Sequence, residues 1–248
     1  MSLAATFDCR AALLASLEKL FAPHSNVPYP SQIYIYGNEN TGKLTMIKHA
    51  LKTHHHSVIA LDCREIYSLN MFYQIFLTSF RSTTNISIPT VKNFNDFIRI
   101  LRQISIEESD GKKKKFKSHH FVLIHHIELL LNFDTSGHLL YLLFKLNELT
   151  LGHFNSTLIL IGHQPFHQLP QMNQIEAELG VLNPISIFVP AYTRAEIVTI
   201  LQQTLTRKQK IRETRSISSF FFIECFSSSS RTTRFLTERS FRSNSDHH

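Results

Sequence analysis

One stretch of the chain has the residue types and spacing of a phosphate-binding loop. It follows the pattern GxxxxGK and comprises Gly37, Asn38, Glu39, Asn40, Thr41, Gly42 and Lys43. The glycines allow the backbone to wrap so that its N–H groups point at phosphate oxygens, and the lysine can reach the outer phosphates of a nucleotide. A helix that begins after the lysine adds the partial positive charge of its N-terminus. We therefore predict a nucleotide-binding site that extends through Leu44 and Thr45.

The residues that would hold a magnesium ion are missing from their expected places. P-loop ATPases carry a Ser or Thr directly after the lysine and an Asp at the end of a neighbouring strand. Here Leu44 follows the lysine, and Thr45 is turned by about 100° along a helix, so we expect it to point elsewhere. The matching strand ends in His125, and magnesium prefers carboxylate and water ligands. We expect ATP binding that is weak or independent of Mg²⁺, with no hydrolysis and no catalytic residue.

A second interpretation is a working P-loop ATPase or kinase. That function requires a carboxylate near the end of the strand, and His125 does not supply one. Glu128, three residues further on, or Asp62 would have to provide it in space.

Fifteen histidines invite the hypothesis of a metal site, because several are adjacent in the sequence. The groups are His54–His56, His119–His120 and His125–His126. Adjacent residues on a strand point to opposite faces, so we expect that His125 and His126 do not chelate one ion. Composition bias explains the histidines better, and we predict no metal site.

The elements around the loop alternate between strands and helices. Short β-branched and aromatic runs predict five strands, at Gln32–Tyr36, Ser57–Leu61, His120–Ile124, Thr157–Ile161 and Ser186–Val189. Apolar residues at helical spacing predict helices at Ala11–Phe21, Leu44–Thr53, Ile66–Phe80, Asn93–Ile104, Leu139–Leu149 and, after a Thr193-x-x-Glu196 capping box, up to Leu205. This order predicts an α/β fold, a three-layer sandwich around a five-stranded parallel sheet.

Composition divides the chain into three predicted parts. Residues 1–27 form an N-terminal helix and linker, residues 28–205 the nucleotide-binding domain, and residues 206–248 a Ser/Phe/Arg-rich tail without predicted structure. The tail has nine Lys or Arg and four Asp or Glu residues, so it carries most of the net charge of +7. A second basic run, Lys112–Lys115 with Lys117, is interpreted as a solvated loop.

Composition also excludes several classes of protein. The three scattered cysteines, Cys9, Cys63 and Cys225, suggest neither a disulfide framework nor a zinc site. Neither a signal peptide nor an apolar run long enough to span a membrane is evident, so we expect a soluble intracellular protein.

Four strings, the first of which leads into the loop, resemble the AAA+ domain of the origin recognition complex subunit 5 family. They are Pro30-Ser31-x-Ile33-Tyr34-Ile35-Tyr36-Gly37, Leu61-Asp62-Cys63, Asn93-Phe94-Asn95-Asp96-Phe97-Ile98-Arg99 and Phe188-x-Pro190-x-Tyr192. The resemblance extends from Phe7 to Leu205. The Asn-Phe-Asn-Asp-Phe string is more specific than the loop, which many unrelated proteins share.

The resemblance implies an AAA+ P-loop fold and a nuclear, mostly non-hydrolysing ATP-binding subunit that works in the initiation of DNA replication. It implies other origin recognition complex subunits as partners, contact with origin DNA through the complex, and a polar sensor at His163 or Gln164. His125 and Leu44 depart from the family pattern. The family continues through a helical lid and a winged-helix region, which this chain is expected to lack. It would then be a truncated form, with a tail from an alternative ending, or a non-functional fragment.

Overall fold

The structure is a computed structural model that describes residues 10–23, 28–81, 91, 93–111, 119–134, 137–169, 172, 183–202 and 205–206. It divides into two compact units, Met1–Tyr192 and Thr193–His248. The Lys112–Lys115 run and the tail after residue 206 lie outside the described residues.

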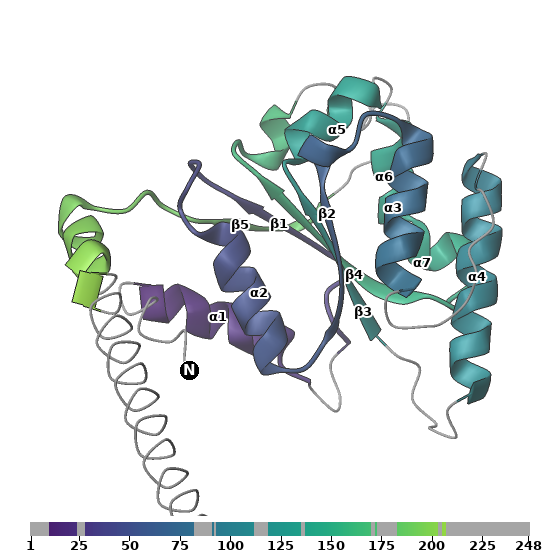
Figure 1. The fold of residues 1–248 in the computed structure, drawn as a ribbon, viewed down its shortest axis with the longest axis horizontal. Helices are drawn as coiled ribbons and strands as arrows, with labels where there is room; N and C mark the ends of the chain where they lie inside the picture. The colour runs from purple at the N-terminus through teal and green to yellow at the C-terminus, as the bar shows by residue number, and fades with distance from the viewer. Residues whose placement is uncertain are drawn as a thin grey trace, which may run out of the picture. The chain divides into compact units, whose positions relative to one another are not determined.

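A five-stranded parallel sheet forms the centre of the first unit (Figure 1). Its strands are β1 (Gln32–Tyr36), β2 (Ser57–Asp62), β3 (His119–His125), β4 (Asn155–Gly162) and β5 (Ile185–Phe188), in the order β2-β3-β4-β1-β5. Every neighbouring pair is parallel. The five predicted strands are confirmed, each to within two residues at either end.

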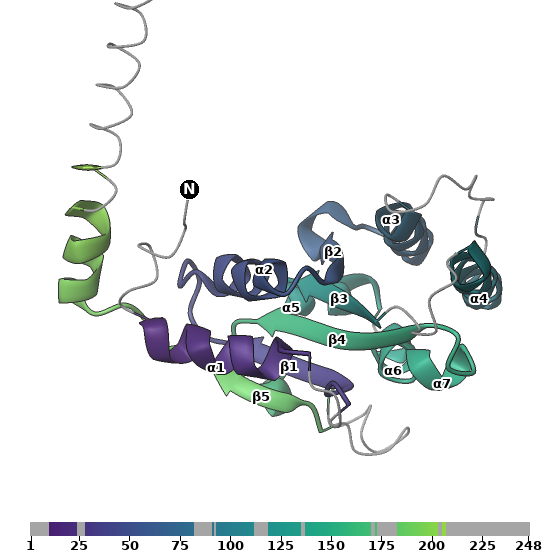
Figure 2. The ribbon, with the colours of Figure 1, turned by 90° about the horizontal axis from the view of Figure 1, so that it is seen from below.

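Helices cover both faces of this sheet, which confirms the three-layer architecture (Figure 2). On one face α1 (Ala11–Phe21) and α2 (Lys43–Thr53) pack on alternate strand residues such as Ile33, Phe121 and Ile159. On the other face lie α3 (Leu69–Arg81), α4 (Phe94–Gly111), α5 (Ile127–Phe133), α6 (His138–Phe144) and α7 (Leu146–Leu149). The alternation of strand side chains between the two cores is what fixes the register of the sheet.

Several helix boundaries differ from those predicted. The predicted helix Ile66–Phe80 begins later, at Leu69, and a short 3-10 turn, η3 (Cys63–Glu65), precedes it. The predicted helix Leu139–Leu149 is two helices, which Lys145 separates. α5 was not predicted, and it begins directly after His126, whose positive φ of 56° turns the chain out of β3.

Most of the histidine groups have structural roles. The rings of His54 and His56 bind the backbone oxygens of Glu18 and Phe21, at 3.1 and 2.7 Å, which holds the end of α1 against the turn after α2. His119 contacts the hydroxyl of Thr157 at 2.9 Å, and His120 contacts that of Ser57 at 3.1 Å. These imidazoles therefore pack against neighbouring groups and form hydrogen bonds within the fold.

The second unit begins with the predicted capping box. The backbone N–H and hydroxyl of Thr193 donate to the Glu196 carboxylate at 2.7 and 2.8 Å, and the Glu196 N–H donates to the Thr193 hydroxyl at 3.3 Å. Helical residues 194–202 follow. Among the described residues, none of the helices is both long and apolar enough to cross a bilayer.

Candidate functional site

The loop between β1 and α2 is shaped by three residues with positive φ: Gly37 at 145°, Asn40 at 57° and Gly42 at 76°. Gly37 also runs against the chain after β5, where an added Cβ would lie 2.1 Å from the Val189 carbonyl oxygen. Gly42 is the residue before α2. Only glycine fits the first position, since both the φ angle and the close backbone approach exclude a side chain.

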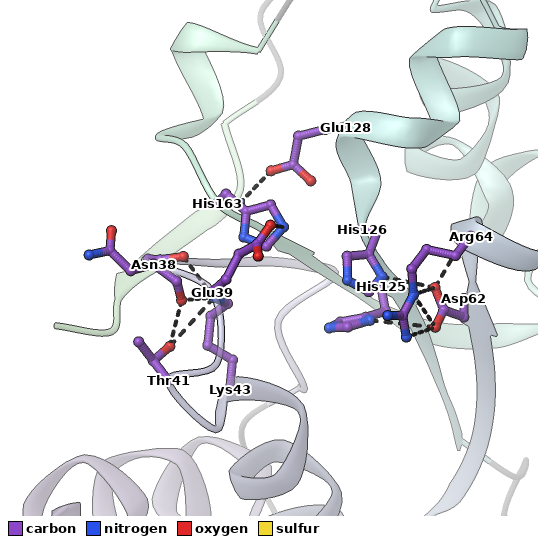
Figure 3. A network of polar contacts seen from close by, with 11 residues as sticks. Asn38, Glu39, Thr41, Lys43, Asp62, Arg64, His125, His126, Glu128 and His163 are labelled. Atoms are coloured by element: carbon purple, nitrogen blue, oxygen red, sulfur yellow. Dashed lines mark hydrogen bonds and ion pairs between the residues drawn. The ribbon is translucent and has the colours of Figure 1, made fainter. Parts of the chain in front are cut away.

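Lys43 is almost completely buried under this loop, with 5% of its surface exposed. Its Nζ donates to the carbonyl oxygens of Gly37 and Asn38 at 2.7 and 2.6 Å, and the Thr41 hydroxyl donates to the Asn38 oxygen at 2.9 Å (Figure 3). Burial lowers the pKa of Lys43, while the carboxylates of Glu128 and Glu39 oppose that shift. The ammonium group therefore lies inside the wrapped loop.

A cavity of about 490 Å³ opens beside the loop. Seven of the nine predicted site residues line it: Glu39, Asn40, Thr41, Gly42, Lys43, Leu44 and Thr45. Leu44 and Thr45 both line the cavity. Thr45 was expected to point away from the site, but it remains part of the cavity wall. Arg64, His125, His126, Glu128, Leu129 and His163 form the rest of the lining.

Glu128, at the start of α5, brings a carboxylate into this cavity. One oxygen, Oε1, accepts a hydrogen bond from the backbone N–H of His163. The other, Oε2, is buried and has no hydrogen-bond partner among the described residues. The imidazole of His163 lies 3.5 Å from the Glu39 carboxylate, so β4 and the loop meet here.

Of the two residues proposed as polar sensors, only His163 lines the cavity. The backbone oxygen of Gln164 accepts a hydrogen bond from the Tyr34 hydroxyl at 2.6 Å, on the α3 and α4 face of the sheet.

Asp62, His125 and His126 meet at the carboxyl ends of β2 and β3 (Figure 3). Asp62 and His125 are register partners. The two imidazole rings are 3.7 Å apart, and both Nδ1 atoms face Asp62, at 2.8 Å for His126 and 3.9 Å for His125. The expectation that the two rings point to opposite faces was wrong, because β3 ends at His125 and the left-handed backbone of His126 turns its ring back.

Charge in this group is set by burial and by Arg64. Burial and the neighbouring His126 lower the pKa of His125 to about 4, so its imidazole is neutral at pH 7. Burial alone would raise the pKa of Asp62, but hydrogen bonds from Arg64 and His126 outweigh it and hold that pKa well below its usual range. Asp62 therefore stays ionised.

The residues at the two family magnesium positions do not fit that ion. The side chain of Leu44 has no oxygen, and His125 presents nitrogen beside a second imidazole. The loop itself is better suited to an anion, because it offers turned backbone and a buried ammonium group.

One cation near the loop was missed from the sequence. The guanidinium of Arg10 lies 3.8 Å over the ring of Tyr192, and it donates to the Pro190 oxygen. Its Nη1 is buried without a hydrogen-bond partner among the described residues. The Tyr192 hydroxyl lies against Gly42, where an added Cβ would be 3.1 Å away. No local pattern signals a pairing between residues so distant in the chain.

Two curated proteins of the same name are similar to the chain, whereas no family model matches it. Origin recognition complex subunit 5 of Drosophila melanogaster is 26% identical over 204 residues, which are 81% of this chain and 40% of that protein. The Homo sapiens protein of that name is 26% identical over 106 residues, 41% of this chain and 24% of its own length. The chain thus spans less than half of either relative.

Solved structures share the fold. A chain in the structure of Drosophila ORC bound to DNA has a TM-score of 0.64 at 24% identity, covering 86% of this chain and 53% of its own. A Walker-type ATPase of Pyrococcus abyssi has a TM-score of 0.55 at 17% sequence identity, and the match covers 81% of this chain and 58% of the ATPase chain. Cdc6p of Pyrobaculum aerophilum has a TM-score of 0.54 at 15% sequence identity, and the match covers 82% of this chain and 52% of the Cdc6p chain. The chain therefore has the AAA+ P-loop fold, and its predicted resemblance to origin recognition complex subunit 5 is confirmed.

Proposed function

We propose that the chain is a non-catalytic, ATP-binding subunit of an origin recognition complex that takes part in the initiation of DNA replication. Its partners are the other subunits of that complex, it meets origin DNA through them, and it works in the nucleus. The observation that carries the nucleotide part is the loop, in which Gly37 and Gly42 wrap the backbone around the buried Nζ of Lys43.

Support for phosphate binding comes from the residues at the cavity wall. The backbone between Glu39 and Gly42 turns beside the N-terminus of α2, which favours an anion. A phosphate oxygen can take the place of the loop carbonyls that Lys43 now contacts, because the ammonium group and the phosphate carry opposite charges, whereas the carbonyls are neutral. Arg10 adds a second cation next to the loop, since its charge reaches Lys43.

The proposed lack of catalysis rests on two residues, Leu44 on α2 and His125 at the end of β3. Hydrolysis needs a metal ion bound near the outer phosphates and a group that orients water. Leu44 and His125 stand at the two metal positions, and neither supplies an oxygen ligand. Nucleotide would then act as a fixed part of the fold and would stabilise it by a free energy that grows with the logarithm of the nucleotide concentration.

A working ATPase remains the second candidate, and Glu128 is the observation that favours it. Its Oε2 is buried at the cavity without a hydrogen-bond partner among the described residues. A turnover assay with ATP and Mg²⁺ separates the two functions. We expect no phosphate release above that of a Glu128→Gln variant. Turnover that Glu128→Gln abolishes and Lys52→Ala retains would establish the ATPase and refute the non-catalytic function.

Assembly into the complex is tested by co-expression. The chain should co-purify with the remaining origin recognition complex subunits of its own organism, and a fluorescently tagged chain should accumulate in the nucleus. An unrelated AAA+ domain of similar size serves as the control. A chain that folds, binds ATP and yet recovers none of these subunits would refute the assembly and leave the nucleotide function standing.

A further inference from the structure

We propose that Asp62, His125 and His126 form a binding site for a divalent transition-metal ion of the zinc type. One ligand atom from each residue lies within 4.8 Å of the other two. Two imidazoles and one carboxylate are a ligand set that zinc uses in proteins, with a fourth position open to water. The site needs no bound nucleotide, so it stands independently of the function proposed above.

The spacing of the ligand atoms suits one shared ion. His126 Nδ1 lies 2.8 Å from one oxygen of Asp62, and His125 Nδ1 lies 3.9 Å from the other. Two atoms bound to a tetrahedral zinc at about 2.0–2.1 Å are about 3.4 Å apart. The two observed distances bracket this value. Small rotations of the side chains are therefore enough to form the site.

A buried imidazole nitrogen of His125 also favours a metal ion at this place. Nδ1 of His125 is buried and has no hydrogen-bond partner among the described residues. The facing Asp62 oxygen, at 3.9 Å, is too far for a hydrogen bond. Buried polar atoms normally have partners, so such an atom calls for an explanation. A cation held between the imidazole nitrogen and the carboxylate satisfies both.

The cluster also differs from the other histidine groups. The imidazoles of His54, His56, His119 and His120 contact backbone or hydroxyl groups, as described above. Only Asp62, His125 and His126 bring three potential ligands together within the part of the chain that the structure describes. Because two of the three ligands are nitrogens, the site favours zinc-type ions over Mg²⁺.

Arg64 competes with a metal ion for the carboxylate of Asp62, so a variant of Arg64 serves as a control. Its guanidinium binds both oxygens of Asp62, with the shortest contact at 2.7 Å. The side chain is 62% exposed, so it can turn into solvent at small cost. Removing its charge should strengthen metal binding. A purely structural Asp62–His126 hydrogen bond makes no such prediction.

The experiment is a titration of the full chain with ZnCl₂ in competition with a chromophoric chelator, and with CoCl₂ followed by visible absorption. We expect one equivalent bound that excess Mg²⁺ does not displace. His125→Ala, His126→Ala and Asp62→Asn should each weaken it by about tenfold or more, since even groups outside a ligand set contribute that much. Arg64→Ala should tighten it. His153→Ala, at an exposed histidine outside the cluster, should match the parent chain.

Circular dichroism and thermal unfolding of each variant separate loss of a ligand from loss of the fold. Equal zinc affinity in the parent chain and in folded His125→Ala and His126→Ala variants would overturn the proposal, because the ion would then lie elsewhere in this histidine-rich chain. Weaker or unchanged binding in Arg64→Ala, together with a cobalt spectrum that no cluster variant alters, would overturn it as well.

Discussion

The Nζ of Lys43 lies 2.7 Å from the carbonyl oxygen of Gly37, so the last residue of the loop holds the first. Five residues separate the two in sequence, and the loop between them is wrapped around the ammonium group. Lys43 thus has a structural role in the loop, and the proposed function gives the same ammonium group a binding role.

Gly37→Ala should destabilise the fold. The new Cβ would meet the Val189 carbonyl oxygen at 2.1 Å, and the φ of 145° is unsuited to alanine. We expect a loss of about 1–3 kcal/mol in the free energy of unfolding, measured by urea denaturation. Gly152→Ala is the matched control, because it has a positive φ of 68° but no atom within 4 Å of the added Cβ. Equal losses in both variants would show that the contact with Val189 has no effect.

Arg10→Met should weaken ATP binding while keeping the packing of the side-chain stem. The guanidinium is buried on Tyr192, its Nη1 lacks a partner among the described residues, and its charge reaches Lys43. Losing one charge-assisted contact costs about 1.5–3 kcal/mol, so the Kd should rise about tenfold or more. Binding is measured by calorimetry. An Arg99→Met variant, at a side chain 75% exposed on α4, should bind as the parent does. Identical Kd values for the two variants would exclude Arg10 from the site.

Leu44→Thr combined with His125→Asp should introduce dependence on magnesium. The two substitutions restore the hydroxyl and carboxylate that the family pattern places around the ion. ATP affinity of the double variant should rise when Mg²⁺ is added, whereas that of the parent should not. Leu44→Thr alone is the control. An affinity that ignores Mg²⁺ in the double variant would mean that these two positions do not face the ion.

Acid should destabilise the fold through His119. Burial lowers the pKa of this imidazole to about 4, below the 6.5 of an exposed histidine. Between these values the unfolded chain binds more protons, so stability falls as pH drops from 6.5 to 4. The thermal midpoint should drop less in His119→Gln, which keeps a donor towards the Thr157 hydroxyl. The same pH dependence in the variant and the parent would contradict this assignment.

The fold was readable from the sequence because its strands are short apolar runs between helical patterns. The loop was readable because glycine and lysine at fixed spacing have a direct structural cause. The reversal at His126 was not, since a non-glycine residue with positive φ leaves no pattern in neighbouring residues. For this reason α5 was missed, and the His125 and His126 rings were assigned to opposite faces.

Contacts between distant residues were equally out of reach. The sequence placed Glu128 near the end of a strand, but not its contact with the backbone of His163 across the sheet. Nor did the sequence indicate that Arg10 reaches Tyr192 or that α1 packs beside α2 on the same face of the sheet. Such contacts depend on how elements pack, which periodicity does not encode.

The central claim is that the loop holds a nucleotide without help from magnesium. Its most direct test is titration of fluorescent ATP into the purified chain, with Mg²⁺ and with EDTA, beside Lys43→Ala and the control Lys52→Ala, an exposed lysine on the same helix. Saturable binding of similar affinity in both buffers, lost only in Lys43→Ala, is the predicted result. No binding in either buffer by a folded chain, or binding that Lys43→Ala leaves unchanged, would contradict it.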